Sequence, residues 1–95
     1  MPTPMPIADN ARPRFVSGVR FQIDRATGKG VLLFPEGILE LNETAQEIVT
    51  RCDGRMLAEI VRELADEYDS DPATLAVDVR ETLNDLRTRK LIEFA

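Results

Sequence analysis

The feature that most constrains this fold is a pair of short apolar runs on either side of a turn, Pro35-Glu36-Gly37. Val31–Phe34 precedes the turn and Ile38–Leu41 follows it. Proline presets the φ angle of a turn and glycine relieves its exit, so the two runs predict a β-hairpin. Residues 19–24 alternate apolar and polar side chains, which predicts a half-buried strand before the hairpin. In an antiparallel meander the second strand is central, so residues 38–41 form an edge.

Three stretches with apolar residues three or four positions apart follow the hairpin: residues 42–54, 56–69 and 71–90. Each predicts an amphipathic helix. Asn42 is a good N-cap for the first, and Thr44 is the alternative because residues 44–47 fit a capping box. Asp71 and Pro72 fit the N-cap and the first turn of the third helix. The apolar residues 91–94 are a candidate fourth strand.

The chain has 95 residues, enough for one domain. Residues 1–14 include four prolines, which lack the N–H that helices and ladders need, so we expect a flexible Pro-rich tail there. The folded domain is expected at residues 15–95. Three strands against three helices form an α+β layer pair, and three helices with a β-element resemble a winged helix. The predicted class is α+β and winged-helix-like, with a three-stranded antiparallel sheet followed by three helices.

Composition argues against catalysis and metal binding. The chain has no histidine, which removes the commonest general base and metal ligand. Its single cysteine, Cys52, lies on the apolar stripe of the first predicted helix, as is typical of a buried thiol. The carboxylates between residues 63 and 71 lack the spacing of a calcium loop, and no Gly-rich phosphate loop accompanies them. We therefore expect no enzyme activity, no catalytic residue, no metal site and no cofactor.

The sequence also bears on location. No stretch approaches the roughly 20 apolar residues that span a bilayer, and the N-terminal prolines do not fit a signal peptide. A lone thiol suits a reducing compartment. We expect a cytoplasmic protein without a membrane partner.

Cations on the third predicted helix raise an alternative function, a winged-helix DNA-binding regulator. Basic residues at positions 80, 87, 89 and 90 are interleaved with acidic residues at positions 78, 81 and 85. The whole chain carries a net charge of −5. Acidic proteins are poorly attracted to phosphate backbones, and DNA-binding domains usually carry a plainly basic patch. We therefore expect no nucleic-acid partner.

The edge strand at residues 38–41 has three interpretations. An edge offers unpaired N–H and C=O groups, but Pro35, Gly37 and Glu40 are typical of an edge that is protected from pairing. Alternatively, an extended peptide pairs with the edge by β-augmentation. In the third interpretation the edge pairs with its own copy, so the chain is a monomer or a weak homodimer.

A longer motif favours the peptide. VLLFPEGILELNETAQEIVTRCDG, residues 31–54, resembles the coenzyme PQQ synthesis protein D (PqqD) family in the order and spacing of three segments: Pro35-Glu36-Gly37, residues 41–45 and Cys52-Asp53-Gly54. Residues 58–64 also fit, and the resemblance covers about residues 15–95. Members often have Ser or Thr soon after the Asp-Gly, where it caps the second helix. This chain has Arg55 and Met56 there, so its cap is an open question.

The resemblance implies a RiPP recognition element, a winged-helix-like module that binds a ribosomally made precursor peptide and catalyses nothing. The expected partners are a PqqA-like precursor and a PqqE-like radical SAM enzyme, which crosslinks a glutamate and a tyrosine of the peptide on the way to pyrroloquinoline quinone. The peptide is expected to add as a strand beside residues 38–41 and to lean on the third helix. The cationic end of that helix, Arg87, Arg89 and Lys90, is expected to attract acidic residues of the peptide. The expected contacts are Gly37, Ile38, Leu39, Glu40, Leu41, Asn42, Val79, Leu83, Leu86 and Arg87. Proline at position 39 or 41 is the corresponding test, because proline cannot donate a ladder hydrogen bond.

Overall fold

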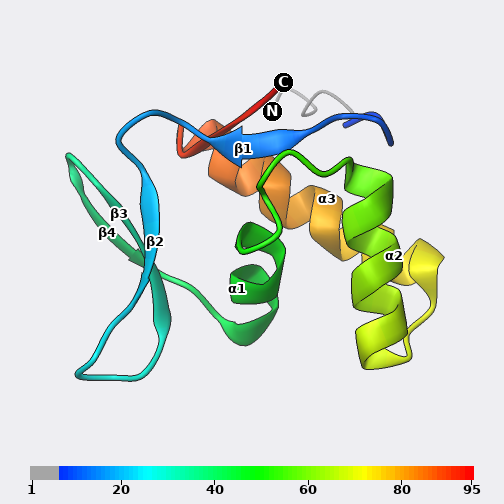
Figure 1. Ribbon diagram of the computed structural model, residues 1–95, viewed down its shortest axis with the longest axis horizontal. Helices are drawn as coiled ribbons and strands as arrows, with labels where there is room; N and C mark the ends of the chain where they lie inside the picture. Colours follow the sequence, from blue (N-terminus) through cyan, green and yellow to red (C-terminus); the bar gives the residue numbers. More distant parts are fainter. Residues whose placement is uncertain (1–6) are drawn as a thin grey trace.

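In the computed structural model, which describes residues 7–95, a three-stranded sheet lies at one end of the molecule and the helices extend from it (Figure 1). The elements in chain order are β1 Pro13–Phe15, β2 Arg20–Ile23, β3 Gly30–Phe34, β4 Gly37–Glu40, α1 Glu43–Val49, α2 Leu57–Tyr68, α3 Pro72–Thr88 and β5 Ile92–Phe94. The predicted α+β class, a three-stranded antiparallel sheet followed by three helices, is confirmed.

The sheet has the order β2-β3-β4, and all of its pairings are antiparallel. Phe34 pairs with Gly37, so Pro35 and Glu36 form a two-residue loop. Within residues 7–95, β4 has a strand neighbour on one side only. β4 is therefore the edge that the sequence predicted.

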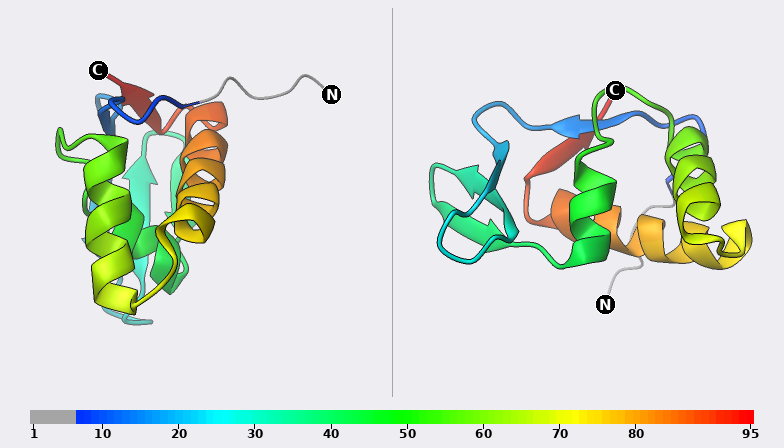
Figure 2. Two further views of the ribbon diagram at one scale, coloured as in Figure 1. Left: turned by 90° about the vertical axis from the view of Figure 1, so that its right-hand side faces the viewer. Right: turned by 60° about the horizontal axis from the view of Figure 1, so that its bottom comes forward.

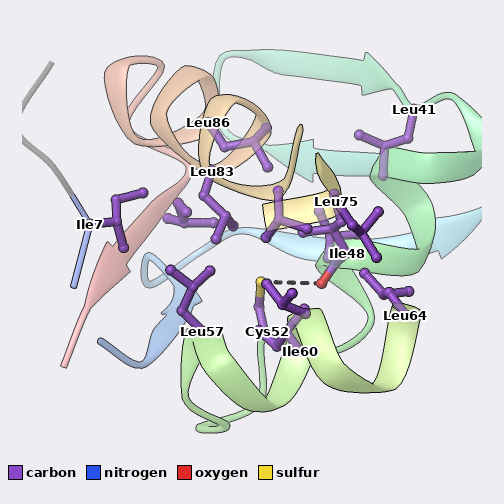
Figure 3. Close-up of a cluster of buried hydrophobic side chains, with 14 of the residues drawn as sticks. Ile7, Leu41, Ile48, Cys52, Leu57, Ile60, Leu64, Leu75, Leu83 and Leu86 are labelled. Carbon is purple, nitrogen blue, oxygen red and sulfur yellow. Dashed lines mark hydrogen bonds between the residues drawn. The ribbon is translucent and has the colours of Figure 1, made fainter. Parts of the chain in front are cut away.

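The core fills the space between the inner face of the sheet and the three helices (Figure 3). Leu32 of the central strand is completely buried, as are Ile48, Leu57 and Ile60. α3 supplies four buried side chains, Leu75, Val79, Leu83 and Leu86. Figure 2 shows α3 crossing the molecule, with its C-terminal half toward the sheet end.

The first helix begins as predicted and ends earlier. Asn42 Oδ1 accepts a hydrogen bond from the Ala45 backbone N–H at 2.8 Å, which decides the N-cap in favour of Asn42 over Thr44. The helix ends at Val49, not at residues 53–54. Cys52 lies in the turn beyond the helix, yet it is buried as expected.

The segment that precedes the sheet differs from the expected tail. Residues 7–15, here called the N-terminal strap, pack on the domain, and Ile7 is only 5% exposed. The backbone carbonyls of Asp9 and Ala11 accept hydrogen bonds from Ala58 N–H and Leu57 N–H, at 3.0 and 2.8 Å. These donors open α2, where helical N–H groups have no partner of their own. The strap therefore answers the open question of how α2 is capped: it supplies backbone acceptors in place of a Ser or Thr side chain, and the Glu59 carboxylate accepts from Met56 N–H.

The strap is also held from two other sides. β1 pairs antiparallel with β5, so the candidate strand at the C-terminus exists but belongs to a separate two-stranded sheet. On α3, Arg80 donates to the backbone carbonyl of Ile7 and to the carboxylate of Asp9. The expected boundary at residue 15 thus falls inside an ordered strand, while residues 1–6 of the expected tail lie outside the described part of the chain.

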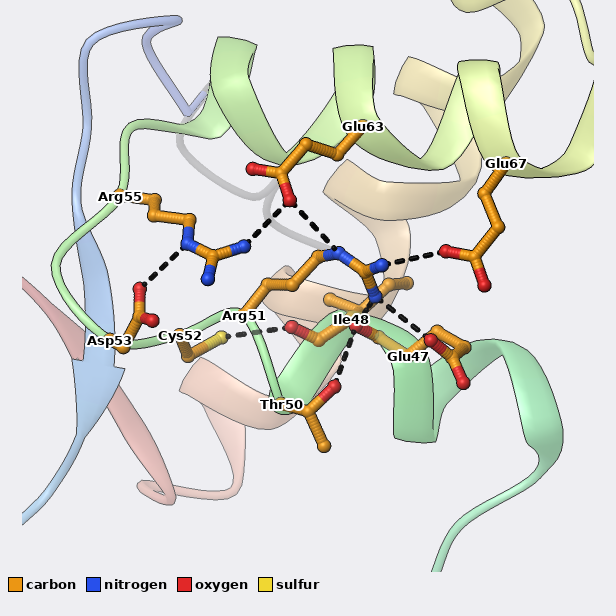
Figure 4. Close-up of polar contacts among 9 residues, drawn as sticks. All are labelled: Glu47, Ile48, Thr50, Arg51, Cys52, Asp53, Arg55, Glu63 and Glu67. Atoms are coloured by element: carbon orange, nitrogen blue, oxygen red, sulfur yellow. Dashed lines mark hydrogen bonds and ion pairs between the residues drawn. The ribbon is translucent and has the colours of Figure 1, made fainter.

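An arginine joins α1 to α2 (Figure 4). The side chain of Arg51, 16% exposed, forms ion pairs with Glu47, Glu63 and Glu67 at 2.9, 3.6 and 2.6 Å. The hydrogen bond to Glu47 is the main cause that raises the pKa of Arg51, and burial opposes it. This cluster links α1, through Glu47, to α2, through Glu63 and Glu67.

Candidate functional site

The backbone groups of β4 alternate between the side that faces β3 and the free outer edge. The N–H of Leu41 donates to the carbonyl of Gly30 in β3 at 2.9 Å. Backbone groups of successive strand residues point to opposite sides, so those of Leu39 also face β3. The N–H and C=O groups of Ile38 and Glu40 therefore face outward. Proline at position 39 or 41 would break the hairpin itself, and the informative positions are 38 and 40.

The side chains of β4 divide between the two faces of the sheet. Leu39 is half-buried against the core, opposite Leu32. Ile38 lies on the outer face and is 58% exposed. Glu40 is also exposed and forms an ion pair with Lys29 at 3.2 Å. The edge thus combines free backbone groups with side chains that do not cover them.

A groove lies between this edge and α3. Its volume is about 400 Å³. The residues that line it are Leu39, Glu40, Leu41, Asn42, Ala45, Glu81, Thr82, Asp85, Leu86 and Arg89. Leu39, Ala45 and Leu86 give the groove an apolar part, while the helix contributes charged side chains. We call this the β4–α3 groove.

The β4–α3 groove continues around the hairpin turn. A second hollow of about 320 Å³ is lined by the turn residues Pro35 and Glu36 and by Lys90 and Leu91 after α3. Arg89 lines both hollows. The end of α3 therefore lies beside the start of β4, whereas Glu81 lies toward the other end, near Asn42 and α1.

The sequence-predicted contacts divide into three groups. Leu39, Glu40, Leu41, Asn42 and Leu86 line the β4–α3 groove. Gly37 and Ile38 belong to the same edge strand without lining the groove.

The other three predicted contacts lie elsewhere. Val79 and Leu83 are completely buried in the core and do not line the groove. Arg87 hydrogen-bonds to Asn84, and its guanidinium lies over the ring of Phe94, 5.3 Å from the centroid. Arg87 therefore faces β5 and not β4.

Three groove residues on α3 were not anticipated from the sequence: Glu81, Thr82 and Asp85. A fourth, Arg89, belongs to the cationic helix end that was expected to attract acidic residues of the peptide. Glu81, Asp85 and Arg89 are four positions apart, so they form one stripe along the helix. Arg89, at one end of this stripe, is next to Leu86 of the apolar stripe, whereas Glu81, at the other end, is exposed on the side of the helix away from Val79. The four-residue spacing of these charged residues was visible in the sequence. Which flank of the buried apolar stripe faces β4 depends on where the sheet lies, and the sequence does not show that.

Within residues 7–95, no group of His, Cys, Asp or Glu side chains is placed to hold a metal ion. Burial, with a smaller contribution from Asp53, raises the pKa of Cys52 to about 12, so this thiol stays protonated at neutral pH and is a poor nucleophile. No helix in the same part of the chain has the length and apolar character to cross a membrane.

Another hollow, of about 500 Å³, lies between α2 and α3 beneath the strap. Small side chains such as Ala65, Ala73 and Ala76 line it, with Arg62 and Asp66 at its rim. Its walls are helices whose backbone groups are already bonded, so it offers no free hydrogen-bonding edge. The β4–α3 groove has one, and it is the candidate site.

The chain is also similar to known proteins. The family model for coenzyme PQQ synthesis protein D (PqqD) matches residues 29–92, which contain β4 and α3. The chain is 42% identical over 87 residues to the "PqqA binding protein" of Xanthomonas axonopodis pv. citri, covering 90% of this chain and 95% of the relative. The same name, identity and coverage apply to a relative from Xanthomonas oryzae pv. oryzae.

Two solved structures are also similar. One is the solution NMR structure of the PqqD truncation of Methylobacterium extorquens PqqCD, described as a functional, stand-alone RiPP recognition element. It superposes with a TM-score of 0.81 at 32% identity, over 95% of this chain and 97% of that one. The other is the crystal structure of PqqD from Xanthomonas campestris, with a TM-score of 0.56 at 38% identity, over 90% and 97%.

Proposed function

The chain belongs to the coenzyme PQQ synthesis protein D family, and we propose that it binds a PqqA-like precursor peptide in pyrroloquinoline quinone biosynthesis without catalysing a step itself. The name of the Xanthomonas relatives and the recognition-element description of the Methylobacterium structure support this role. The geometry adds a mode of binding, in which the peptide becomes a fourth strand beside β4.

The observation that carries this proposal is the free edge of β4 next to the β4–α3 groove. Ile38 and Glu40 present outward N–H and C=O groups that a guest strand satisfies by antiparallel pairing. Guest side chains on the inner face enter the groove and contact Leu39, Ala45 and Leu86. Backbone pairing accepts many sequences, so these side-chain contacts supply the selectivity.

The structure changes which of the expected contact residues the proposal retains. Residues 37–42 and Leu86 remain, and Glu81, Asp85 and Arg89 join them. Val79 and Leu83 support the groove from below as core residues, since they are completely buried. The guanidinium of Arg87 lies over the ring of Phe94 in β5, so the proposal does not retain Arg87 as a contact of the guest.

The bound peptide is then presented to a PqqE-like radical SAM enzyme. A guest strand at the edge of a sheet keeps its own outer edge and its flanking residues free, so the crosslinking enzyme can reach the segment beyond the bound part. This role needs no cofactor in the present chain, and we place it in the cytoplasm.

Two alternatives give different results in simple assays. For a winged-helix DNA-binding regulator, a gel shift with duplex DNA would show a complex; the carboxylates of Glu81 and Asp85 beside Arg89 disfavour one. For a β4-paired homodimer, sedimentation would show a dimer that the precursor peptide dissociates, because the second protomer and the peptide compete for the same edge of β4.

Proline substitutions test strand addition directly. Ile38→Pro removes an outward N–H and no hydrogen bond within the protein, so the hairpin is expected to survive. The guest C=O that faces this position is left without its donor, and an unsatisfied buried acceptor costs about 1–3 kcal/mol, which predicts a roughly 5- to 160-fold weaker affinity for a synthetic PqqA peptide. Isothermal titration calorimetry measures the affinity, and circular dichroism checks the fold.

The matched control is Ile38→Ala, which removes the same side chain and keeps the N–H. It is expected to bind within about threefold of the unmodified protein, because the Ile38 side chain faces away from the groove. Strand addition at β4 is wrong if the alanine and proline variants bind equally well while both stay folded.

A further inference from the structure

We propose that the β4–α3 groove selects a charge order in its guest strand: a basic residue near Glu81 and an acidic residue near Arg89, four positions apart, with an apolar residue midway. This inference rests on the proposed strand addition at β4. It names the class of peptide that the groove accepts, and it fixes the direction in which the peptide runs.

The charges along the groove change sign from one end to the other. Glu81 and Asp85 lie on the part of α3 toward Asn42, and Arg89 and Lys90 lie at the hairpin turn. Arg89 Nε is 3.1 Å from Asp85 Oδ2, and both side chains are more than half exposed. That pair partly offsets itself, and Glu40 is paired with Lys29, so within residues 7–95 Glu81 remains as the unpaired negative charge of the groove. Arg89 supplies the positive end, with Lys90 in the adjoining hollow that also contains Glu36.

Glu81 is free to take a guest cation. It is exposed, and it forms no ion pair with any residue between positions 7 and 95. An exposed carboxylate of this kind adds little to the stability of the fold. Its place beside the free edge gives it a function in recognition instead.

The spacing follows from the rise of a helix and of a strand. Glu81 and Arg89 are eight residues apart, which is about 12 Å along an α-helix. A strand advances about 3.3 Å per residue, so 12 Å corresponds to roughly 3.6 residues. Only even spacings place two side chains on the same face of a strand, and four is the nearest. The guest residue midway between the charges then faces Leu39 and Leu86.

The direction follows from the pairing geometry. Antiparallel pairing is slightly more stable per residue than parallel pairing, and an antiparallel guest starts at the Asn42 end of β4 and ends at the turn. Its earlier residue then lies beside Glu81 and its later residue beside Arg89. The preferred order, from the N-terminus, is basic, any residue, apolar, any residue, acidic.

Two blocked synthetic peptides test this order against each other. One reads Thr-Lys-Thr-Val-Thr-Glu-Thr, and the other has its lysine and glutamate exchanged, so composition and net charge are the same. Titration of the ¹⁵N-labelled full chain, followed through the Ile38 and Glu40 amides, gives both affinities. We expect the lysine-first peptide to bind about fivefold tighter at low salt, and the ratio to fall toward one at 1 M salt.

Direction has its own readout. A nitroxide at the N-terminus of the lysine-first peptide is expected to broaden the amide signal of Asn42 more than that of Gly37. Broadening strongest at Gly37 would show a parallel guest and overturn the assignment of direction.

A double charge exchange in the protein supplies the second test. Glu81→Lys with Arg89→Glu is expected to reverse the preference, so that the glutamate-first peptide binds tighter. The control is Arg62→Glu with Asp66→Lys, which exchanges two exposed charges four positions apart on α2, outside the groove. The control is expected to keep the original preference.

The results separate this inference from the proposed function. Equal affinity of both peptides in the unmodified protein, or no reversal by the exchange in α3, overturns the charge order alone if the peptides still shift the β4 amides. If neither peptide nor a full-length PqqA peptide shifts those amides, strand addition itself fails.

Discussion

Replacing Ile7 by alanine is expected to lower the free energy of unfolding by about 2–3 kcal/mol. Ile7 is 5% exposed, so almost all of its side chain leaves water on folding. The substitution removes three carbons, and about 0.8 kcal/mol for each gives about 2.4 kcal/mol. Buried Ile→Ala changes usually fall between about 2 and 5 kcal/mol. We expect the low end, because the strap lies at the rim of the core, where neighbouring side chains can close the space.

Urea unfolding followed by circular dichroism at 222 nm measures this change. In a domain of this size, about 2 kcal/mol also corresponds to a melting temperature roughly 8–16 °C lower. Ile23→Ala is the matched control, since the same three carbons are removed from a side chain that is 43% exposed. It is expected to lower the free energy of unfolding by no more than about 1 kcal/mol.

The outcome decides whether residues 7–14 belong to the domain. A change below about 0.5 kcal/mol for Ile7→Ala would mean that the strap does not pack in solution and that the tail expected from the sequence is correct. The affinity of the folded variant for a PqqA peptide is expected to be unchanged, because Ile7 does not line the β4–α3 groove.

Three further predictions concern stability. Burial raises the pKa of Cys52 from 9.0 to about 12, so the thiol of the unfolded chain loses its proton at lower pH than the thiol of the folded chain. The stability of the fold is therefore expected to fall as pH rises from about 9 toward 12. Cys52→Ala lacks this contribution, so the urea midpoints of the variant and of the unmodified protein should converge over that range. Arg51→Met leaves the carboxylates of Glu47, Glu63 and Glu67 without their shared cation. We expect chemical denaturation to show a free energy of unfolding about 1–3 kcal/mol lower, and an unchanged value would contradict a structural role for Arg51. Asn42→Ala removes the cap of α1 and is expected to cost about 1 kcal/mol, while Asn42→Asp, which can still accept the hydrogen bond, should retain most of the stability.

Local patterns in the sequence predicted most of the fold because local interactions determine those elements. The two-residue loop after Phe34 needs only the conformational preferences of proline and its neighbours, and the N-cap at Asn42 needs only a side chain three residues before Ala45 N–H. The same loop also determines which residues of β4 face outward. Because Phe34 pairs with Gly37 at the loop, the backbone N–H and C=O groups of residues 37, 39 and 41 face β3 and those of residues 38 and 40 face outward. This alternation follows from the loop length alone.

The N-terminal strap was not predictable in the same way. The four prolines of residues 1–14 remove hydrogen-bond donors, which favours a tail on composition alone. The strap is ordered by hydrogen bonds to another element. α2 begins without a Ser or Thr cap, and its first N–H groups donate to the backbone carbonyls of Asp9 and Ala11. The absence of a cap at Met56 was the available signal, but nothing local indicates that the acceptors come from 45 residues or more earlier in the chain.

The groove on α3 was predicted only in part for a related reason. Helical periodicity identifies Val79, Leu83 and Leu86 as one apolar face, but it does not show where that face ends. The sheet lies along one flank, so Leu86 reaches the groove while Val79 and Leu83 are covered from all sides. Charged residues on that flank look like an ordinary solvated surface until β4 is placed beside them.

The shortness of β4 has a kinetic consequence. Between the hairpin turn and Asn42, only Ile38 and Glu40 face outward, so a guest gains about four backbone hydrogen bonds. At roughly 0.5–1.5 kcal/mol each, the ladder alone holds the guest weakly, and association rates within one interface vary little, so a weak ladder means a short residence time. Under the proposed strand addition, release of the peptide would therefore need no opening motion of the protein, because a guest held by so short an edge would dissociate spontaneously.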